Sequence, residues 1–240
     1  LDNLGYPVGV VSDDIDGETR HMTLPDIGAD EWTTPTDDAG ITSIDESQTY
    51  CIDNDYVFAT IKNYGTSNLT SCTINWEVNG VPQTPYSWTG NLAQGASDGP
   101  VNLGFYDFSL GSMYSVKVFT SNPNGNTEGL NHNDTTEINN VYQAMSGTYT
   151  IGGTSPDYTT INDALTDLHN GGVCGPVTFD IRAGVYNVQE SINNIQGTSA
   201  TNTVTFKSES NDSTAVVWTY TPTSTDNYTV NLNGCEYVRL

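Results

Sequence analysis

The sequence predicts an all-β protein in which a β-sandwich of roughly 100 residues is followed by widely spaced strands of a solenoid. Three observations support this prediction. Only 15% of the 240 residues are charged and 35% are hydrophobic, while 14 Tyr and 23 Gly accompany many Asn and Thr, a mixture that favours strands and turns. Apolar and polar residues alternate in several short runs. A convincing helical pattern occurs once.

Residues 1–33 form the first expected unit, and they contain a dense polar stretch from Ser12 to Arg20. Residues 33–38 are rich in Thr, Asp and Pro, which indicates a short polar linker. The chain begins with Leu1 and ends in a strand-like run at Leu240, so we expect both ends to be cut from a longer protein. The lack of a signal peptide therefore does not argue against secretion.

Residues 38–143 carry the alternation expected of the sandwich. Val57, Ala59 and Ile61 share one face of a predicted strand. The dipeptide Asn79-Gly80 directly follows a second alternating run and is a strong hairpin signal. The other positions predicted to face inward are Cys72, Ile74, Trp76, Val78, Tyr114, Val116 and Val118.

Residues 147–240 begin with a helix predicted from Thr159 to Asn170, because apolar residues recur there at helical spacing. Thr160 can cap its first turn, and Gly171-Gly172 can end it. The first two strand runs after it both read Val-Thr-Phe and lie roughly 26 residues apart, a spacing typical of successive solenoid turns. The predicted strand runs are 177–181, 203–206, 215–218, 228–232 and 237–240.

The charge balance excludes several classes of partner. Six Lys and Arg residues stand against 29 Asp and Glu, which gives a formal net charge of −23. We therefore expect no nucleic-acid partner, because phosphate contacts require basic patches, and an anionic membrane surface is disfavoured for the same reason. No apolar run reaches the ~18 residues of a membrane span, so no membrane insertion is expected. An acidic, Lys-poor chain of this kind is typical of the extracellular space.

Several stretches resemble known modules. Asp14–Arg20 with Pro25–Glu31 resembles the closing motif of right-handed parallel β-helices in secreted bacterial surface proteins. Tyr158–Leu165, followed by Gly175–Ile181 and Gly184–Tyr186, resembles the helix-capped opening of such a β-helix. The middle is similar to the Ig-like module called CARDB, through Ile61–Thr66, Asn91–Gly95 and Asn131–Asp134.

The order of these modules implies a CARDB-type sandwich between the end of one β-helix (1–33) and the start of the next (147–240). This arrangement resembles the giant, type IX-secreted adhesins of Bacteroidota. It implies a non-catalytic structural or adhesive repeat of an extracellular, cell-surface fibre. The expected partners are neighbouring modules of the same chain, other copies in a fibre and surface polysaccharides. The alternatives are part of a secreted polysaccharide-degrading enzyme, or a carbohydrate-binding module.

Catalysis is not expected. Glycoside hydrolysis needs two facing carboxylates, but Asp13-Asp14 falls in the closing turn and Asp37-Asp38 in the linker. His21, His132 and His169 are scattered. The motifs of polygalacturonase-like β-helix enzymes are absent from the sequence.

Calcium is the one ligand that the N-terminal segment suggests, and no other cofactor is expected. Asp13, Asp14, Asp16 and Glu18 place oxygen ligands around Gly17. The alternative is a structural turn held by Arg20, since the segment has no twelve-residue loop ending in a bidentate Glu. A second oxygen-rich group is interpreted as a turn-rich sandwich loop. It comprises Asn122, Asn124, Asn126, Glu128, Asn133 and Asp134.

The four cysteines contain no C-x-x-C pair, so a zinc site is not expected. Cys51 and Cys72 lie in one predicted extracellular module, and we predict a disulfide between them; the alternative is two small buried thiols. Cys174 and Cys235 precede strand runs that are expected to lie two coils apart, at ~9.6 Å, so that pair is not predicted to bridge.

Two further kinds of surface site are considered. Trp88 is the better surface candidate for stacking on a sugar ring, although sandwich packing also explains it, whereas Trp76 is assigned to the core. If the resemblance to Bacteroidota proteins holds, it implies O-glycosylation at Asp-Ser/Thr steps. Those steps place the modified residues at Thr135 and Ser213, in segments expected to be exposed loops.

Overall fold

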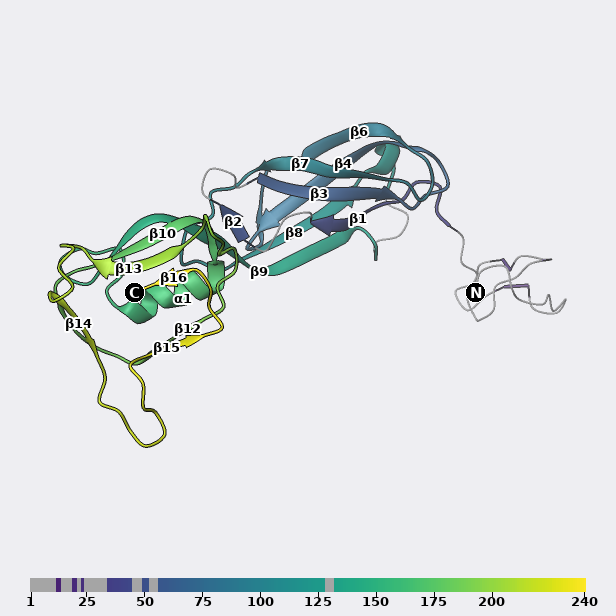
Figure 1. The fold of residues 1–240 in the computed structure, drawn as a ribbon. Helices are drawn as coiled ribbons and strands as arrows, with labels where there is room; N and C mark the ends of the chain where they lie inside the picture. Colours follow the sequence, from purple (N-terminus) through teal and green to yellow (C-terminus); the bar gives the residue numbers. More distant parts are fainter. Residues whose placement is uncertain are drawn as a thin grey trace.

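The computed structural model describes residues 12–13, 19–20, 23, 34–44, 49–51, 56–127 and 132–240 (Figure 1). Strands dominate these residues, so the all-β class is confirmed. Most of the predicted closing segment 1–33 lies outside the described residues. Within the described residues, no helix combines the length and the apolar character needed to cross a membrane.

Two facing sheets form a β-sandwich, as the sequence predicts. One sheet has the order β1-β3-β7, and the facing sheet contains β9-β8-β4, with β5 and β6 also paired to β4 and β2 to β9. Buried apolar side chains of both sheets form one core. The elements of this unit are β1 (Ala39–Ile44), β2 (Thr49–Cys51), β3 (Tyr56–Asn63), β4 (Leu69–Val78), β5 (Val81–Pro82), β6 (Tyr86–Leu92), β7 (Ser97–Phe105), β8 (Tyr114–Ser121), the 3₁₀ turn η1 (Pro123–Gly125) and β9 (Thr135–Ile151).

The predicted faces of the strands are confirmed. Val57, Ala59 and Ile61 are fully buried, because alternate residues of β3 point toward the facing sheet. Asn79 and Gly80 both have positive φ angles, 49° and 74°, as the tight turn between β4 and β5 requires.

The expected polar linker is instead partly built into the sandwich. The carbonyls of Pro35 and Thr36 accept hydrogen bonds from the backbone of Thr66 and Ser67. Asp38 is only 1% exposed. The prediction of a linker at 33–38 is therefore wrong for Pro35 and Thr36, because turn-forming residues can also pair with a sheet, whereas Asp38 belongs to the sandwich, whose predicted range begins at residue 38.

Strand β9 belongs to both halves of the chain. Its first part pairs antiparallel with β8 in the sandwich, and its last part, Gly147–Ile151, pairs parallel with β10. Residues 144–146, between the two predicted modules, lie inside this strand. The sandwich core reaches to Val141, and a second hydrophobic core begins at Met145. One continuous strand thus joins two cores (Figure 1).

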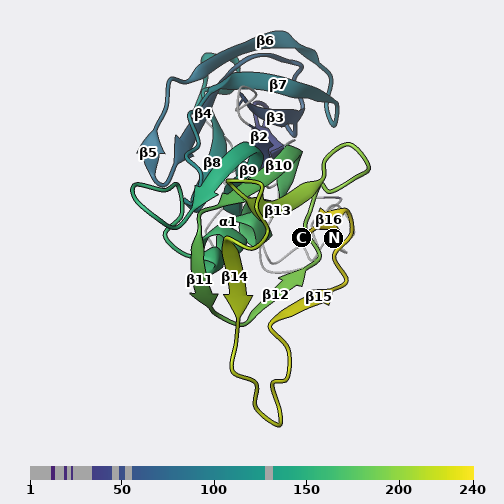
Figure 2. The same ribbon diagram turned by 60° about the vertical axis from the view of Figure 1, so that its left-hand side comes forward.

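The C-terminal part contains parallel strand pairs on three sides. β13 lies between β10 and β16, β11 pairs with β14, and β12 pairs with β15. The two Val-Thr-Phe runs pair as expected, with Val177 beside Val204 and Phe179 beside Phe206. Figure 2 shows these pairs around the helix. The bounds are α1 (Ile161–Gly171), β10 (Val173–Ile181), β11 (Gly184–Asn187), β12 (Glu190–Asn193), β13 (Val204–Ser208), β14 (Val216–Thr219), β15 (Val230–Asn233) and β16 (Val238–Arg239).

The predicted helix is confirmed as α1. The Thr160 hydroxyl accepts a hydrogen bond from the backbone N–H of Asp163, and Gly172 ends the helix with a φ of 64°. Its apolar face packs into the second core. Gly171 lies so close to β9 that a Cβ there would meet the carbonyl oxygen of Gln143 at 2.2 Å. The helix is thus packed against the strand that both units share.

Candidate functional site

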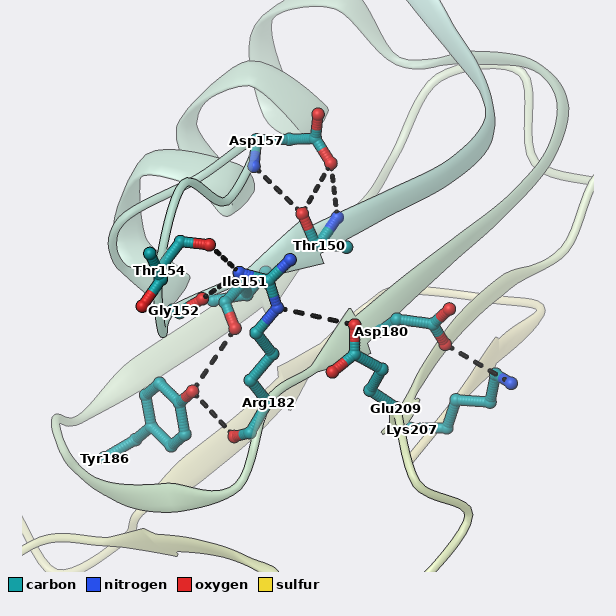
Figure 3. A network of polar contacts seen from close by, with 10 residues as sticks. All are labelled: Thr150, Ile151, Gly152, Thr154, Asp157, Asp180, Arg182, Tyr186, Lys207 and Glu209. Atoms are coloured by element: carbon teal, nitrogen blue, oxygen red, sulfur yellow. Dashed lines mark hydrogen bonds and ion pairs between the residues drawn. The ribbon is translucent and has the colours of Figure 1, made fainter.

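A polar cluster at one corner of the parallel strands connects three neighbouring layers (Figure 3). It lies where β9, β10 and β13 end, because Ile181 of β10 is in register with both Ile151 and Ser208. Arg182, which follows β10, donates from Nη1 to the carbonyls of Gly152 and Thr154, which follow β9. Its Nε lies 3.4 Å from Oε1 of Glu209, which follows β13. We call Arg182, Tyr186, Glu209 and Gly152–Thr154 the coil clasp.

Tyr186 adds a second link within the coil clasp. Its hydroxyl lies 2.8 Å from the carbonyl oxygen of Arg182 and 3.3 Å from that of Ile151. Burial is the main cause that raises the pKa of Tyr186, so the hydroxyl keeps the proton that it donates.

Two glycines allow the coil clasp to close. Gly152 and Gly153 both have a φ of 74°, which other residues rarely adopt. A Cβ on Gly152 would lie 2.3 Å from the Tyr186 hydroxyl, and one on Gly153 would lie 2.6 Å from Cδ of Arg182. The turn after β9 is therefore shaped to receive these two side chains.

Charged and polar pairs continue on both sides of the coil clasp. The backbone N–H and the hydroxyl of Thr150 both donate to Asp157, and these hydrogen bonds hold the pKa of Asp157 below its usual value. Lys207 of β13 lies 3.2 Å from the carboxylate of Asp180 on β10, its direct neighbour in register. The polar contacts thus run across the strands.

Aromatic rings stack on the buried side of the same layers. Phe179 and Phe206 are stacked with 4.7 Å between ring centroids, and Tyr149 lies 6.0 Å from Phe179 on the other side. Trp218 extends the contact at 6.4 Å from Phe206. Layers are therefore connected by rings inside and by the coil clasp outside. Such an arrangement resists separation of the layers.

The coil clasp leads to a first prediction. Replacing Arg182 with methionine keeps the aliphatic chain but removes the donors to two carbonyls and the partner of Glu209. We expect the free energy of unfolding to fall by about 1–2 kcal/mol, since the Arg182 side chain is 25% exposed and part of its charge interaction is screened. The control, Lys117→Met, removes a partly exposed ion pair with Glu77 at 3.9 Å in the other unit and should cost less than about 0.5 kcal/mol. Denaturant titration of both variants checks the difference, and equal losses would contradict the assigned role.

The predicted Cys51–Cys72 disulfide is wrong. Cys51 lies beside Ala144 near the middle of β9, whereas Cys72 of β4 neighbours Thr73, which pairs with Ser121 of β8. Phe119 of β8 pairs with Thr135. Since Ser121 lies beyond Phe119, Cys72 is level with a position before Thr135 of β9, whereas Cys51 is level with Ala144. The two cysteines are therefore at least nine residues apart along the strand direction, about 30 Å at ~3.3 Å per residue. A bridge needs Cα atoms within ~7 Å.

The other cysteines follow the expected spacing. Val177 pairs with Val204 and Val204 with Val238, so Cys174, near the start of β10, and Cys235, before β16, belong to layers two steps apart. The sequence-based reason for not pairing them is confirmed.

The structure gives different results for the two oxygen-rich groups noted in the sequence. Asp13 forms a β-bridge with Thr19, as in a turn, while Asp14, Asp16 and Glu18 lie outside the described residues. Asn124 and Asn126 both donate to the carboxylate of Asp37 at 2.6 and 2.7 Å, which agrees with a structural loop. Among the described residues, no group of three or more His, Cys, Asp or Glu side chains is suited to a metal ion.

The remaining candidates divide between core and surface. Trp76 and Trp88 are both 3% exposed, and Trp88 donates from Nε1 to Asp98 at 2.8 Å, so Trp88 is not available to a sugar. Thr135 and Ser213 are exposed. Ser213 lies in a turn as expected, but Thr135 is the first residue of β9 rather than part of a loop.

Sequence reasoning missed the role of Arg182. Its position directly after a strand run, together with the scarcity of basic residues, was an available signal. Its partners come from strands roughly 30 residues away on each side, however, so they can be identified only once the register is known.

Comparisons with known proteins are sparse. No family model and no curated protein matches the chain. One similar solved structure is the 272–376 domain of a Methanosarcina acetivorans chain named as a cell surface protein, with 22% identity, a TM-score of 0.39 and coverage of 46% of this chain and 94% of that one. Another is a CARDB domain from Pyrococcus furiosus in complex with di-metal ions, with 14% identity, a TM-score of 0.37 and coverage of 48% and 100%. Each match spans about half of this chain.

Proposed function

We propose that this chain is a non-catalytic structural segment of a large extracellular bacterial fibre or adhesin. Its task is to act as a stiff spacer between other modules. The observation that carries the proposal is strand β9, a single strand that pairs first in the sandwich sheet and then, past a register shift and Gly147 with its φ of 90°, in the first parallel layer. A hinge needs backbone that is free of such pairing, so this junction transmits force and orientation.

We further propose that residues 147–240 are the first coils of a parallel β-helix capped by α1. The parallel pairs on three sides and the stacked rings support this. An end cap is needed because a solenoid exposes unpaired edges. The sandwich is proposed to be a CARDB-like module, and residues 1–33 the closing segment of a preceding β-helix.

The proposed partners follow from this role. They are neighbouring modules of the same chain, other copies within a fibre and surface polysaccharides. A formal net charge of −23 favours repulsion between neighbouring fibres and disfavours binding to nucleic acid. No catalytic residue is assigned.

Single-molecule pulling on the full chain, held by handles at its ends, tests the spacer proposal. We expect the sandwich and the parallel layers to resist force and to unfold in discrete steps, without a soft extension from the junction. Gradual lengthening at low force would overturn the proposal. A parallel incubation with a panel of polysaccharides tests the enzyme alternative, since release of shortened or unsaturated products would establish catalysis.

A carbohydrate-binding role has one observation in its favour. Tyr56 and Phe105 are 39% and 53% exposed, and their rings pack edge to face at 5.6 Å. Exposed rings can stack on sugars, so a glycan array with wild type and Tyr56→Ala distinguishes this function. Binding that is lost in the variant would favour the binding module over a pure spacer.

The surface assignment leads to a prediction of O-glycosylation at Thr135 and Ser213. The exposure of both residues supports access by a transferase. Asp212, which precedes Ser213, accepts hydrogen bonds from the backbone and the hydroxyl of Thr214, so the sequence step sits in an ordered turn. Glycopeptide mass spectrometry of native material should find a glycan on both residues. Fully unmodified peptides would end this prediction.

A further inference from the structure

Three polar residues meet where β1 and β9 begin. Asp38 immediately precedes β1, and Asn133 and Asp134 immediately precede β9. Their backbone is fixed, since the carbonyl of Asp38 accepts from the N–H groups of Tyr64 and Gly65, and the carbonyl of Asp134 accepts from Thr120. The positions of the three side chains are therefore set by the sandwich and not by a loose loop.

The side chains of this cluster have buried oxygen atoms without partners. Asp38 is 1% exposed and Asp134 is 8% exposed. The Nδ2 group of Asn133 donates to Oδ2 of Asp38 at 3.3 Å, which leaves Oδ1 of Asp38 available. Oδ1 of Asp38, Oδ1 of Asn133 and Oδ1 of Asp134 are all buried and accept no hydrogen bond. Buried polar atoms are normally satisfied, so these three oxygens are candidate ligands for a cation.

Of the basic side chains, His132 acts on both carboxylates through its charge. Among the described residues, the ion pairs join Lys117 with Glu77, Arg182 with Glu209, and Lys207 with Asp180. Burial, followed by repulsion from Asp38, raises the pKa of Asp134 to about 6. The charge of His132 acts in the opposite direction but is the smaller cause. The two carboxylates therefore lie close enough to repel each other.

We propose that Asp38, Asn133 and Asp134 bind a calcium ion through their three Oδ1 atoms. Two carboxylates and an amide carbonyl form an all-oxygen set, which suits Ca²⁺, whereas Zn²⁺ prefers His and Cys ligands. Ca²⁺ takes six to eight ligands, so backbone carbonyls and water complete its shell. The ion ties the start of β1 to the start of β9 and stabilises the sandwich at the end opposite the junction. This site is independent of the group around Asp13.

Isothermal titration of the full chain, first stripped with a chelator, tests this proposal with Ca²⁺ as the probe. Wild type should bind with a dissociation constant of roughly 10⁻⁴–10⁻³ M, the range of extracellular sites. Asp38→Asn and Asp134→Asn should each weaken binding about tenfold or more, because each removes a charged ligand. Near-ultraviolet circular dichroism shows whether each variant is folded.

Two control variants make the test specific. Glu190→Gln neutralises another buried carboxylate that has an unpartnered oxygen, Oε1, but stands in the second unit, and it should bind Ca²⁺ like wild type. The double variant Asp14→Asn with Asp16→Asn removes the N-terminal candidate and should also bind like wild type. If the double variant loses Ca²⁺ while Asp134→Asn keeps it, the ion belongs to the N-terminal segment and the proposal fails.

A melting curve provides a second readout for variants with altered folding. Ca²⁺ should raise the melting temperature of wild type and of Glu190→Gln, since a ligand that binds only the folded state stabilises it. Asn133→Ala keeps both carboxylates, so it should still respond, but at higher Ca²⁺ concentrations. No rise for wild type at millimolar Ca²⁺ would overturn the site.

Discussion

Replacing Phe179 with alanine is expected to lower the free energy of unfolding by about 3–5 kcal/mol. Phe179 is fully buried in β10 and stacks on Phe206 at 4.7 Å, with Tyr149 and Tyr158 at 6.0 and 6.3 Å. The substitution leaves a cavity bounded by rings of neighbouring layers, which cannot collapse without moving the strands. This loss of stability should appear chiefly in the unit formed by the parallel strands, whose core contains Phe179.

Chemical denaturation followed by tryptophan fluorescence measures this effect. Trp218 lies in the second unit, and Trp76 and Trp88 lie in the first, so the variant should separate two transitions. The control Val185→Ala removes a side chain from the same coil that is 71% exposed, and it should change stability by less than about 0.5 kcal/mol. A loss below about 1 kcal/mol for Phe179→Ala would contradict a packed aromatic interior.

The second large effect is expected from Gly197→Ala, which should lower the free energy of unfolding by about 3 kcal/mol or more. Gly197 has a φ of 84°, and a Cβ there would lie 1.9 Å from the carbonyl oxygen of Val173. The neighbouring Gln196 carbonyl accepts from the N–H of Val173 at 2.9 Å, so this contact closes the first coil on its own start. Backbone atoms cannot move aside as a flexible side chain can.

Gly234→Ala is the matched control for that prediction. Gly234 also has a positive φ, 71°, but nothing lies within 4 Å of the position of its Cβ. Gly234→Ala should lower the free energy of unfolding only by the cost of left-handed backbone for alanine, about 1–2 kcal/mol. Thermal unfolding of Gly197→Ala and Gly234→Ala separates the cost of left-handed backbone from the cost of the steric clash. Equal destabilisation would mean that the coil does not close at Gly197.

The parts that local sequence signals determine were predictable. Alternation places Val57 and Ile61 on the buried face of β3, and the Thr160 cap with Gly172 bounds α1, because these signals act over a few residues. The repeat of Val-Thr-Phe likewise predicts the pairing of β10 with β13, since identical side chains stack in successive layers.

Features that depend on sheet order were not predictable. The Cys51–Cys72 bridge failed because membership in one module says nothing about which end of a strand a residue occupies. Asp38 resembled a linker residue, yet pairing of β1 with β3 carries it into the interior next to Asn133. The coil clasp was missed for the same reason, since Arg182 meets Glu209 only through the register of β10 and β13.

Hydrogen exchange across the junction tests the central claim, that β9 joins the two units rigidly, most directly. Tyr142 to Ala144 pair with β2, Met145 donates to the carbonyl of Gly172 at 2.9 Å, and Gly147 to Ile151 pair with β10. Hydrogen-bonded amides within residues 142–148 should therefore exchange about a thousandfold or more slowly than unstructured chain, while the exposed residues 224, 225 and 227 exchange fast. Exchange of the junction amides as fast as those exposed residues would contradict the account, because it would show two modules on a flexible tether.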